Sequence, residues 1–218
     1  SGDDEAGPRL DTDPVALQAA SAEAMGGVTG ARFSLARTGE PVYIDAAGLI
    51  GLDSLEGVYA APSSAQAELA VTVSGALKTK IGAVAIAEEI WLSNPLSGEF
   101  ETLPPGFDID PSSLFDPKGA WQPLLESLQD VAFVAEEERN DQPAYHLTGT
   151  APEARISAVT AGLVRGSDVE IDLWINPETA LVDALEFETD IGGGSNAWVL
   201  ELGDYGESFD ISDPTIGQ

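Results

Sequence analysis

The chain has few residues suited to covalent or acid–base chemistry, and their placement argues against catalysis. It contains no cysteine and one histidine, His146, so thiolate catalysis and cysteine-based metal sites are excluded. His146 shares the parity of Ala144 and Thr148 in a predicted strand, which puts it on the outer face of a sheet. We expect a hydrogen-bonded or solvated histidine there rather than a general base. The sequence therefore predicts no catalytic residue and no enzymatic activity.

Carboxylates are abundant, but none of their clusters has the pattern of a known site. Runs such as Glu88-Glu89 and Glu136-Glu137-Glu138 are typical of solvated strand ends. Asp108-Ile109-Asp110 offers oxygen ligands but lacks the glycine and distal glutamate of a calcium loop. Gly192-Gly193-Gly194 lies between two predicted strands with no helix after it, unlike a phosphate-binding loop. We therefore predict no metal and no cofactor.

The charge of the chain excludes one class of partner. Nine Lys and Arg residues stand against 38 Asp and Glu residues, giving a net charge of -29, and no basic residue follows Arg165. Nucleic acid binding is excluded because it needs basic side chains to neutralise phosphates. Charge-driven binding to an anionic membrane is disfavoured for the same reason. We expect the acids to form a solubilising surface.

The region from Pro111 to Thr150 predicts a helix followed by a hairpin. Its large apolar residues Trp121, Leu124, Leu125 and Leu128 follow the spacing i, i+3, i+4, i+7, which puts them on one face of a short helix. After Asp130 the period changes to two, and two alternating strands flank an Asn-Asp-Gln-Pro turn. A helix that leads into a hairpin is typical of a sheet covered by helices on one face.

Capping and alternation predict the other elements. Asp13 and Pro14 begin a helix that ends at Gly26-Gly27, and a further helix begins after Thr150. Together with the hairpin, alternating residues predict about eleven strands, the others being 33–37, 42–44, 57–61, 68–74, 79–92, one at Phe100, 169–175, 181–191 and 197–202. We predict an acidic tether over residues 1–12, a single domain over 13–205 and an acidic tail over 206–218. No transmembrane helix or signal peptide is visible, so we expect a cytosolic chain or a mature exported form.

A row of small residues allows two interpretations. Ala83, Ala85 and Ala87 share one parity of the strand predicted over 79–92. In the first interpretation a neighbouring helix fills the space above them, and in the second the space stays open for a ligand. The residues alone favour the first, because protein interiors are close-packed.

Four segments between Trp91 and Ile191 resemble the LppX/LprG-type (LppX_LprAFG) family of bacterial cell-envelope lipoproteins, whose fold is similar to that of the carrier LolA. The order and spacing of these segments carry the resemblance. They read NPLSGEFETLP, LFDPKGAWQPLL, DVAFVAEEERNDQPAYHLTGTAP and VEIDLWINPETALVDALEFE.

The resemblance implies a fold and a function. The fold would be α+β and β-dominated, with a strongly curved antiparallel sheet, a half-barrel, wrapping a few helices around an apolar cavity. The function would be that of a monomeric carrier for a lipid or acylated glycolipid in the cell envelope, with an envelope transport partner as a further expectation. Its membrane anchor would be an acylated cysteine located before Ser1.

The resemblance also changes the preferred interpretation of the alanines from filled to open. The predicted lining of the cavity comprises Phe33, Leu35, Leu69, Val71, Val73, Ile81, Ala83, Ala85, Phe115, Leu124, Leu125, Leu128, Phe133, Leu147, Ile156, Val159, Ile171, Leu173, Leu185 and Phe187. The main alternative is a structural lipoprotein with a filled core that docks a protein partner through its acidic face. A carboxylate-dependent hydrolase is a weaker third hypothesis.

Overall fold

The computed structural model describes residues 9–87, 89–95, 97–103, 115–191 and 194–216. In this part of the chain, twelve strands form one antiparallel sheet. Of the sequence features named above, residues 1–8 of the predicted tether, Glu88, Asp108-Ile109-Asp110 and Gly192-Gly193 lie outside the described residues. The strands are β1 (Gly30–Gly39), β2 (Val42–Tyr43), β3 (Ile50–Ala60), β4 (Ser64–Val73), β5 (Leu77–Ile86), β6 (Glu89–Ser93), β7 (Phe100–Thr102), β8 (Gln129–Arg139), β9 (Gln142–Ala151), β10 (Val169–Ile175), β11 (Val182–Ile191) and β12 (Gly194–Gly203).

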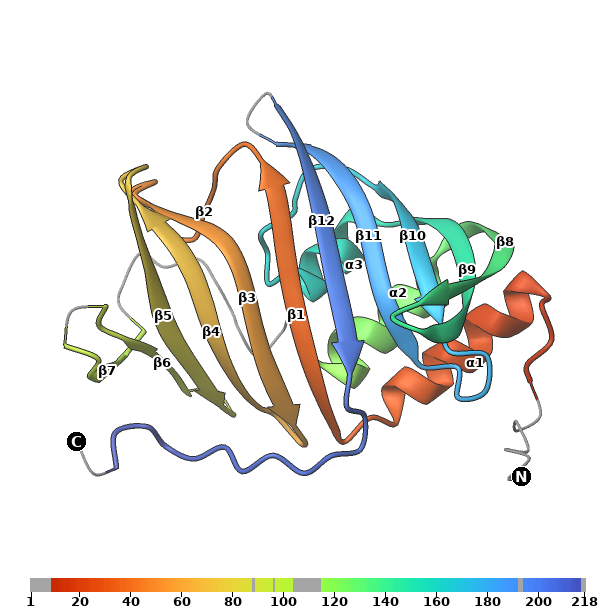
Figure 1. Ribbon diagram of the computed structural model, residues 1–218, viewed down its shortest axis with the longest axis horizontal. Helices are drawn as coiled ribbons and strands as arrows, with labels where there is room; N and C mark the ends of the chain where they lie inside the picture. Colours follow the sequence, from red (N-terminus) through yellow and green to blue (C-terminus); the bar gives the residue numbers. More distant parts are fainter. Residues whose placement is uncertain (1–8, 88, 96, 104–114, 192–193, 217–218) are drawn as a thin grey trace.

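The sheet consists of two meanders that meet at its centre. Its strand order is β7-β6-β5-β4-β3-β1-β12-β11-β10-β9-β8, with β2 paired to β3 outside this path. The pairing of β1 with β12 joins the meanders, with Phe33 opposite Leu202 and Leu35 opposite Leu200. Figure 1 shows β1 and β12 side by side at the middle of the sheet.

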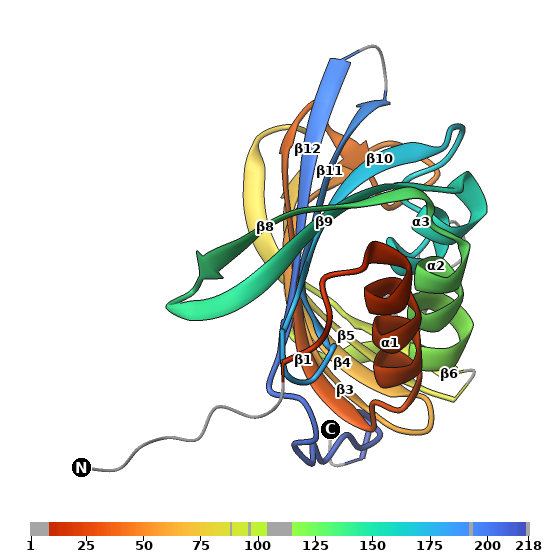
Figure 2. The same ribbon diagram turned by 90° about the vertical axis from the view of Figure 1, so that its right-hand side faces the viewer.

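Three α-helices cover one face of the sheet, as Figure 2 shows from the side. Helix α1 (Pro14–Gly26) begins where the Asp13 carboxylate accepts a hydrogen bond from Ala16 N at 2.8 Å, as predicted. Helix α2 (Gln122–Ser127) follows the π-helical turn η2 (Pro117–Trp121), and α3 (Glu153–Val159) precedes β10. No helix in the described ranges is long and apolar enough to cross a membrane.

The predicted hairpin is confirmed, and its turn has a clear cause. β8 and β9 pair antiparallel, and Asn140 and Asp141 between them have φ angles of 52° and 61°. Two successive residues with positive φ are typical of a type I′ turn, whose twist matches that of the strands. Asn and Asp tolerate this left-handed conformation better than most residues.

Two details of the strand prediction are wrong. The segment 79–92 is two strands, because the backbone turns at Ala87, whose φ is 55°. This turn makes the twelfth strand. The strand predicted over 57–61 starts earlier, because β3 begins at Ile50 and continues to Ala60.

The strongly curved half-barrel is also wrong. The sheet is twisted but not strongly curled, and its terminal strands β7 and β8 lie at opposite ends of the strand order. A sheet curls tightly where bulges and glycine kinks are repeated across it. Here the pairing register shifts at only a few described positions in β3, β8 and β10. The outcome is an open sheet with a helical layer on one side.

Candidate functional site

The predicted cavity residues converge on the space between the sheet and the helices. Those in strands lie on the helix-facing side, and most of the twenty belong to one buried hydrophobic cluster. Ala85 is buried outside this cluster, while Val73 and Phe133 are partly buried against it. Leu124, Ile156 and Val159 supply the helical side and are fully buried. Their role in lipid binding remains a prediction.

Small residues of adjacent strands form a patch on this inner face. Across three neighbouring strands, Gly57 pairs with Ala67, and Ala67 pairs with Ala83. A Cβ atom built on Gly57 would lie 2.8 Å from Cζ of Phe33, so the phenyl ring lies against this glycine. Ala87 does not extend the patch, since it is exposed in the turn after β5.

Four aromatic side chains gather beside this patch. Phe115 is at their centre, with ring centroids 5.1 Å from Tyr59, 6.1 Å from Phe33 and 6.2 Å from Trp121. Phe115 and Trp121 are fully buried. The ring of Phe33, on Gly57, thus belongs to an aromatic cluster that reaches the helical layer.

A surface pocket of about 290 Å³ lies where α1 ends and η2 begins. Its wall includes Gly26, Tyr59, Asp116 and Lys118. We call it the Tyr59 pocket. The hydroxyl of Tyr59 donates a hydrogen bond to Pro62 O at 3.0 Å, and burial, aided by the charge of Asp116, raises the pKa of Tyr59. Because Tyr59 also contacts Phe115, it lies between this pocket and the buried ring of Phe115.

Asp116 has a local structural role at the pocket. Its carboxylate accepts hydrogen bonds from Lys118 N at 3.0 Å and from Gly119 N at 2.8 Å. These bonds cap η2 and satisfy amides that its first turn leaves unpaired. The wall of the pocket thus includes a carboxylate that is engaged by the backbone, and it also includes the basic residue Lys118.

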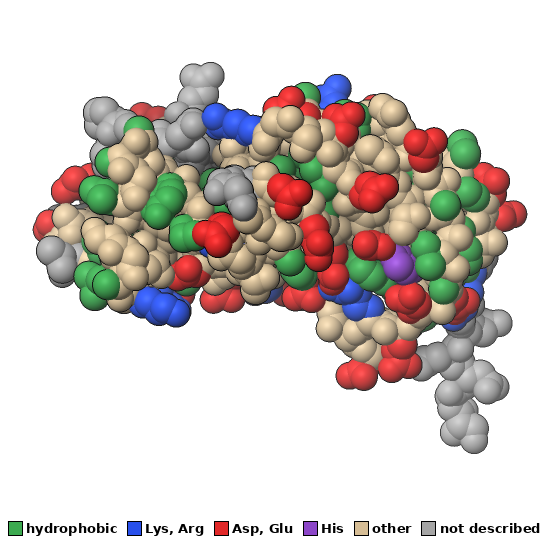
Figure 3. All heavy atoms as spheres, turned by 90° about the horizontal axis from the view of Figure 1, so that it is seen from above, with side chains coloured by type: hydrophobic (Ala, Val, Ile, Leu, Met, Phe, Trp, Pro, Cys, Tyr) green, Lys and Arg blue, Asp and Glu red, His purple; other side chains and the backbone are tan. Residues whose placement is uncertain are grey.

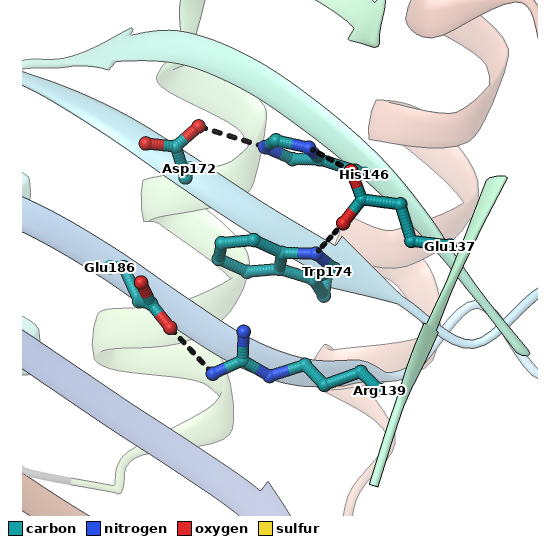
Figure 4. Close-up of polar contacts among 6 residues, drawn as sticks. All are labelled: Glu137, Arg139, His146, Asp172, Trp174 and Glu186. Atoms are coloured by element: carbon teal, nitrogen blue, oxygen red, sulfur yellow. Dashed lines mark hydrogen bonds and ion pairs between the residues drawn. The ribbon is translucent and has the colours of Figure 1, made fainter. Parts of the chain in front are cut away.

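The outer face of the sheet carries a different cluster, drawn in Figure 4. His146 lies on this face as predicted, and its two ring nitrogens lie 3.1 Å from Glu137 Oε1 and 2.8 Å from Asp172 Oδ1. Trp174 lies between His146 and Arg139. The centroid of the Trp174 ring lies 4.6 Å from the centroid of the His146 ring and 4.3 Å from Cζ of Arg139. Hydrogen bonds from Trp174 and His146 lower the pKa of the Glu137 carboxyl.

These contacts favour a structural role for the outer cluster. Both faces of Trp174 are covered, so it offers no free platform for a sugar ring. Both ring nitrogens of His146 are engaged by carboxylates, so neither is directed to a substrate. Arg139 also forms an ion pair with Glu186 at 2.6 Å, so the cluster spans β8 to β11. It links neighbouring strands of the meander that includes β8–β11.

A groove of about 590 Å³ lies next to this cluster on the outer face. Its walls are rich in carboxylates, namely Asp168, Glu170, Asp172, Glu186, Glu188 and Asp190. Within the described residues, no group of three or more such side chains is arranged to hold a metal ion. Its negative charge disfavours anionic ligands.

Sequence reasoning missed several residues of the inner layer. Leu52 and Leu55 are both buried although they are three positions apart, because a register shift between Leu52 and Ser54 changes the parity of β3. Tyr59 follows the parity of Leu55 and could have been found from it. Tyr205 follows β12, where its hydroxyl donates to Val182 O. This long-range contact has no sequence signal.

The comparisons with known proteins agree with the predicted resemblance. The model of the LppX_LprAFG lipoprotein family matches residues 13–211. LprF from Mycobacterium bovis has a similar structure, with a TM-score of 0.73 and 13% identity over 95% of this chain and 99% of that chain. Lipoprotein LppX from Mycobacterium tuberculosis gives a TM-score of 0.62 and 18% identity over 92% of this chain and 100% of that chain.

A LolA superfamily protein from Nitrosomonas europaea gives a TM-score of 0.30 and 10% identity over 91% of this chain and 94% of that chain. No curated protein matches the sequence. The likeness to LprF and LppX shows the fold, and the match over residues 13–211 shows the family. The chain belongs to the LppX_LprAFG lipoprotein family.

Proposed function

We propose that the protein is a non-enzymatic carrier that holds the acyl chains of a lipid or glycolipid between its sheet and its helices. Membership of a lipoprotein family supports a location in the bacterial cell envelope. The observation that carries the proposal is the Tyr59 pocket, because Tyr59 in its wall also belongs to the aromatic cluster of the inner layer.

The energetics of acyl chains suit such a site. Each methylene moved out of water contributes about 0.8 kcal/mol, so a twelve-carbon chain offers up to roughly 10 kcal/mol before ordering costs. This free energy requires apolar walls and no catalytic group. The inner face of the sheet and the facing helices are apolar throughout the buried cluster.

Because the core is closely packed, an acyl chain can enter it only if side chains move. Phe33 and Phe115 are 4% and 0% exposed, so their rings occupy the space beside the small-residue patch. In our proposal an acyl chain enters past Tyr59 and displaces the ring of Phe115. The chain then lies over Gly57, Ala67 and Ala83. A pocket of about 290 Å³ is at the small end of ligand sites, so the remaining volume comes from this displacement.

The charges at the rim of the pocket affect which lipid headgroup can bind there. Lys118 and Asp116 have opposite charges, and the Asp116 carboxylate already accepts two backbone hydrogen bonds. The whole protein, however, has a net charge of -29. A neutral sugar or glycerol headgroup avoids long-range repulsion and accepts hydrogen bonds from Lys118. We therefore propose neutral glycolipids or acylglycerols in preference to anionic phospholipids.

Lipid extraction from protein purified from its own envelope tests the proposal. We expect the wild-type protein to yield bound lipid by mass spectrometry, and Ala83→Phe to yield little, because the larger side chain fills the small-residue patch. Ala36→Phe makes the same change at an exposed position of β1 and should retain lipid. Circular dichroism checks folding, and Ala85→Phe replaces Ala83→Phe if that variant unfolds. Wild-type protein without lipid, or equal lipid in all variants, would contradict the proposal.

A second candidate is supported by the close packing of the core. A lipoprotein with a permanently filled core would act as a structural or interaction protein, docking a partner through its acidic outer face. The groove between β10 and β12 with its carboxylates is the surface that fits this function. Protein that is purified free of lipid and does not take up added lipid would favour this candidate.

A further inference from the structure

Two neighbouring turns at one corner of the sheet carry exposed apolar side chains. The first comprises residues 43–50, from the end of β2 to the start of β3, and the second comprises residues 73–78, from the end of β4 to the start of β5. We call these two segments the apolar tip. Tyr43 is 49% exposed, Leu49 is 51% exposed and Leu77 is 61% exposed. These are half of the exposed large hydrophobic residues identified in the described chain.

The two turns are fixed to each other by the sheet. Ile50 pairs with Val73, and Ser74 N donates a hydrogen bond to Leu49 O at 2.7 Å. Leu77 pairs with Val73 across the hairpin of β4 and β5. The tip therefore lies at the upper left of Figure 1, where these strands end.

Internal hydrogen bonds order the first turn. The Asp45 carboxylate accepts from Leu49 N at 3.0 Å and from Ile50 N at 2.7 Å. Gly48 N donates to Asp45 O at 3.1 Å, and the φ of Gly48 is 66°. Because these bonds hold the backbone, Leu49 is presented to solvent by an ordered loop.

The tip is almost without charge in a strongly acidic protein. Residues 43–50 and 73–78 include one acid, Asp45, and one base, Lys78, whereas the chain has 38 acids and a net charge of -29. The carboxylate of Asp45 is engaged by the backbone of its own loop. The segments Ala46–Leu49 and Ser74–Leu77 are exposed and uncharged. In Figure 3, several hydrophobic side chains are exposed at the left of the view, with acidic side chains at its left edge and across its centre and right.

We propose that the apolar tip docks on the surface of a lipid bilayer with electrically neutral headgroups. Tyr side chains favour the interfacial region of membranes, and leucines insert below it. Lys78 can bury its methylene stem while its ammonium stays among the headgroups. The acids of the remaining surface would repel an anionic bilayer, so the neutral tip is the part that can approach closely.

The size of the tip favours a bilayer over a protein partner. A stable protein interface buries roughly 20–30 residues on each side. The tip offers two short turns and three large apolar side chains, and a bilayer needs no complementary shape to accept them. This inference is independent of lipid carriage, because docking needs no ligand in the inner layer.

Co-flotation of the purified protein with phosphatidylcholine vesicles tests the inference. We expect wild-type protein to float with the vesicles, and the double variant Leu49→Ser/Leu77→Ser to bind about 100-fold more weakly, at about tenfold for each leucine. The matched control is Val15→Ser/Val134→Ser, because these valines are 68% and 49% exposed away from the tip. The control should bind as the wild type does. Adding phosphatidylglycerol at low salt should weaken binding.

A second variant reports the contact directly. Leu77→Trp should show fluorescence quenching by phosphatidylcholine with brominated acyl chains, beyond that of the wild-type tryptophans. Failure of the wild type to float, or equal loss in tip and control variants, would overturn the inference. So would a wild-type dimer in sedimentation velocity that the tip variant lacks, since a second copy would then be the occupant. Extracted lipid plays no part in these readouts, so either proposal can fail alone.

Discussion

The two faces of the sheet use the same strands in opposite ways. On β10, Ile171 and Leu173 face the helices and are buried in the core, whereas Asp172 and Trp174 belong to the outer face. The inner face is held by apolar packing between strands and helices. The outer face is held by hydrogen bonds, ion pairs and stacking among the side chains of neighbouring strands.

The difference assigns apolar packing to the inner face and contact with water to the outer face. Alternation of side chains lets one strand serve both faces without compromise. The outer face carries charge that keeps the protein in solution and aromatic contacts that hold the meander. The inner face is buried, so its residues can be large and apolar without affecting solubility. We expect changes on the two faces to have different effects.

The largest effect is expected from a cavity in the inner face. Leu147→Ala on β9 removes a side chain that is 1% exposed, and should lower the free energy of unfolding by about 2–5 kcal/mol. Val134→Ala on the adjacent strand β8 affects a side chain that is 49% exposed. It should change the free energy of unfolding by about 0.5 kcal/mol or less. Guanidinium unfolding measures both. Equal losses would show that the faces do not differ in packing.

A smaller effect is expected on the outer face. A double-mutant cycle of Arg139→Met and Trp174→Leu should give a coupling energy of about 1 kcal/mol from the cation–π contact. The ion pair of Lys80 with Glu68, where the side chains are 66% and 48% exposed, is the reference. Its cycle should give about 0.5 kcal/mol or less. Coupling of Arg139 with Trp174 no larger than this reference would remove the outer cluster from the account of stability.

Asp183 on β11 predicts a pH dependence. Burial raises the pKa of Asp183 to about 6, against 3.8 for the free side chain, and the charge of Arg139 opposes this only in part. The folded state therefore binds the proton more tightly than the unfolded state. The stabilisation is complete below pH 3.8 and is lost as pH rises through about 6. Because this side chain is partly exposed to water, the pH-dependent stabilisation is limited to roughly 1 kcal/mol.

Asp183→Asn tests this titration. The substitution should raise stability at pH 7 and flatten its change between pH 7 and pH 4. Asp190→Asn, at an exposed position of the same strand, removes one charge without relieving burial and should leave the slope almost unchanged. Thermal unfolding at a series of pH values gives the comparison. Parallel curves for the wild type and Asp183→Asn would show that Asp183 is not the group responsible.

An effect of similar size is expected from salt. With a net charge of -29, the outer surface repels itself, and the Debye length falls from about 30 Å at 0.01 M to about 8 Å at 0.15 M salt. We expect Tm to rise by about 2–4 °C over this range, which corresponds to roughly 1 kcal/mol in a domain of this size. Leu147→Ala should show the same rise, since it leaves the charges unchanged. No rise in either protein would mean that the acids are dispersed or locally paired.

Local patterns in the sequence predicted much of the fold. The capping of α1 by Asp13, the Asn140-Asp141 turn and the position of His146 on the outer face all follow from short-range rules. The pairing of β1 with β12 does not, because it joins segments more than 150 residues apart and depends on the whole sheet. The bulge at Leu52 is also unpredictable from alternation, because a register shift has no fixed sequence pattern.

The candidate site was predicted in composition but not in shape. The lining expected from the family resemblance included Phe33, Ala83 and Leu185, and these residues are buried in the inner layer. The aromatic cluster around Phe115 depends on how η2 packs on β1 and β3, which no local pattern encodes. For the same reason the Tyr59 pocket could not be foreseen, since its walls come from α1, β3 and η2.

In the proposed function, acyl chains lie between the sheet and the helices. Photo-crosslinking with a neutral acylglycerol that carries a diazirine near the end of one acyl chain tests this placement. We predict that mass spectrometry finds the adducts on inner residues, at Phe115 and on the strands around Ala83. Adducts confined to the outer face, around Trp174 and the carboxylate groove, would contradict the claim.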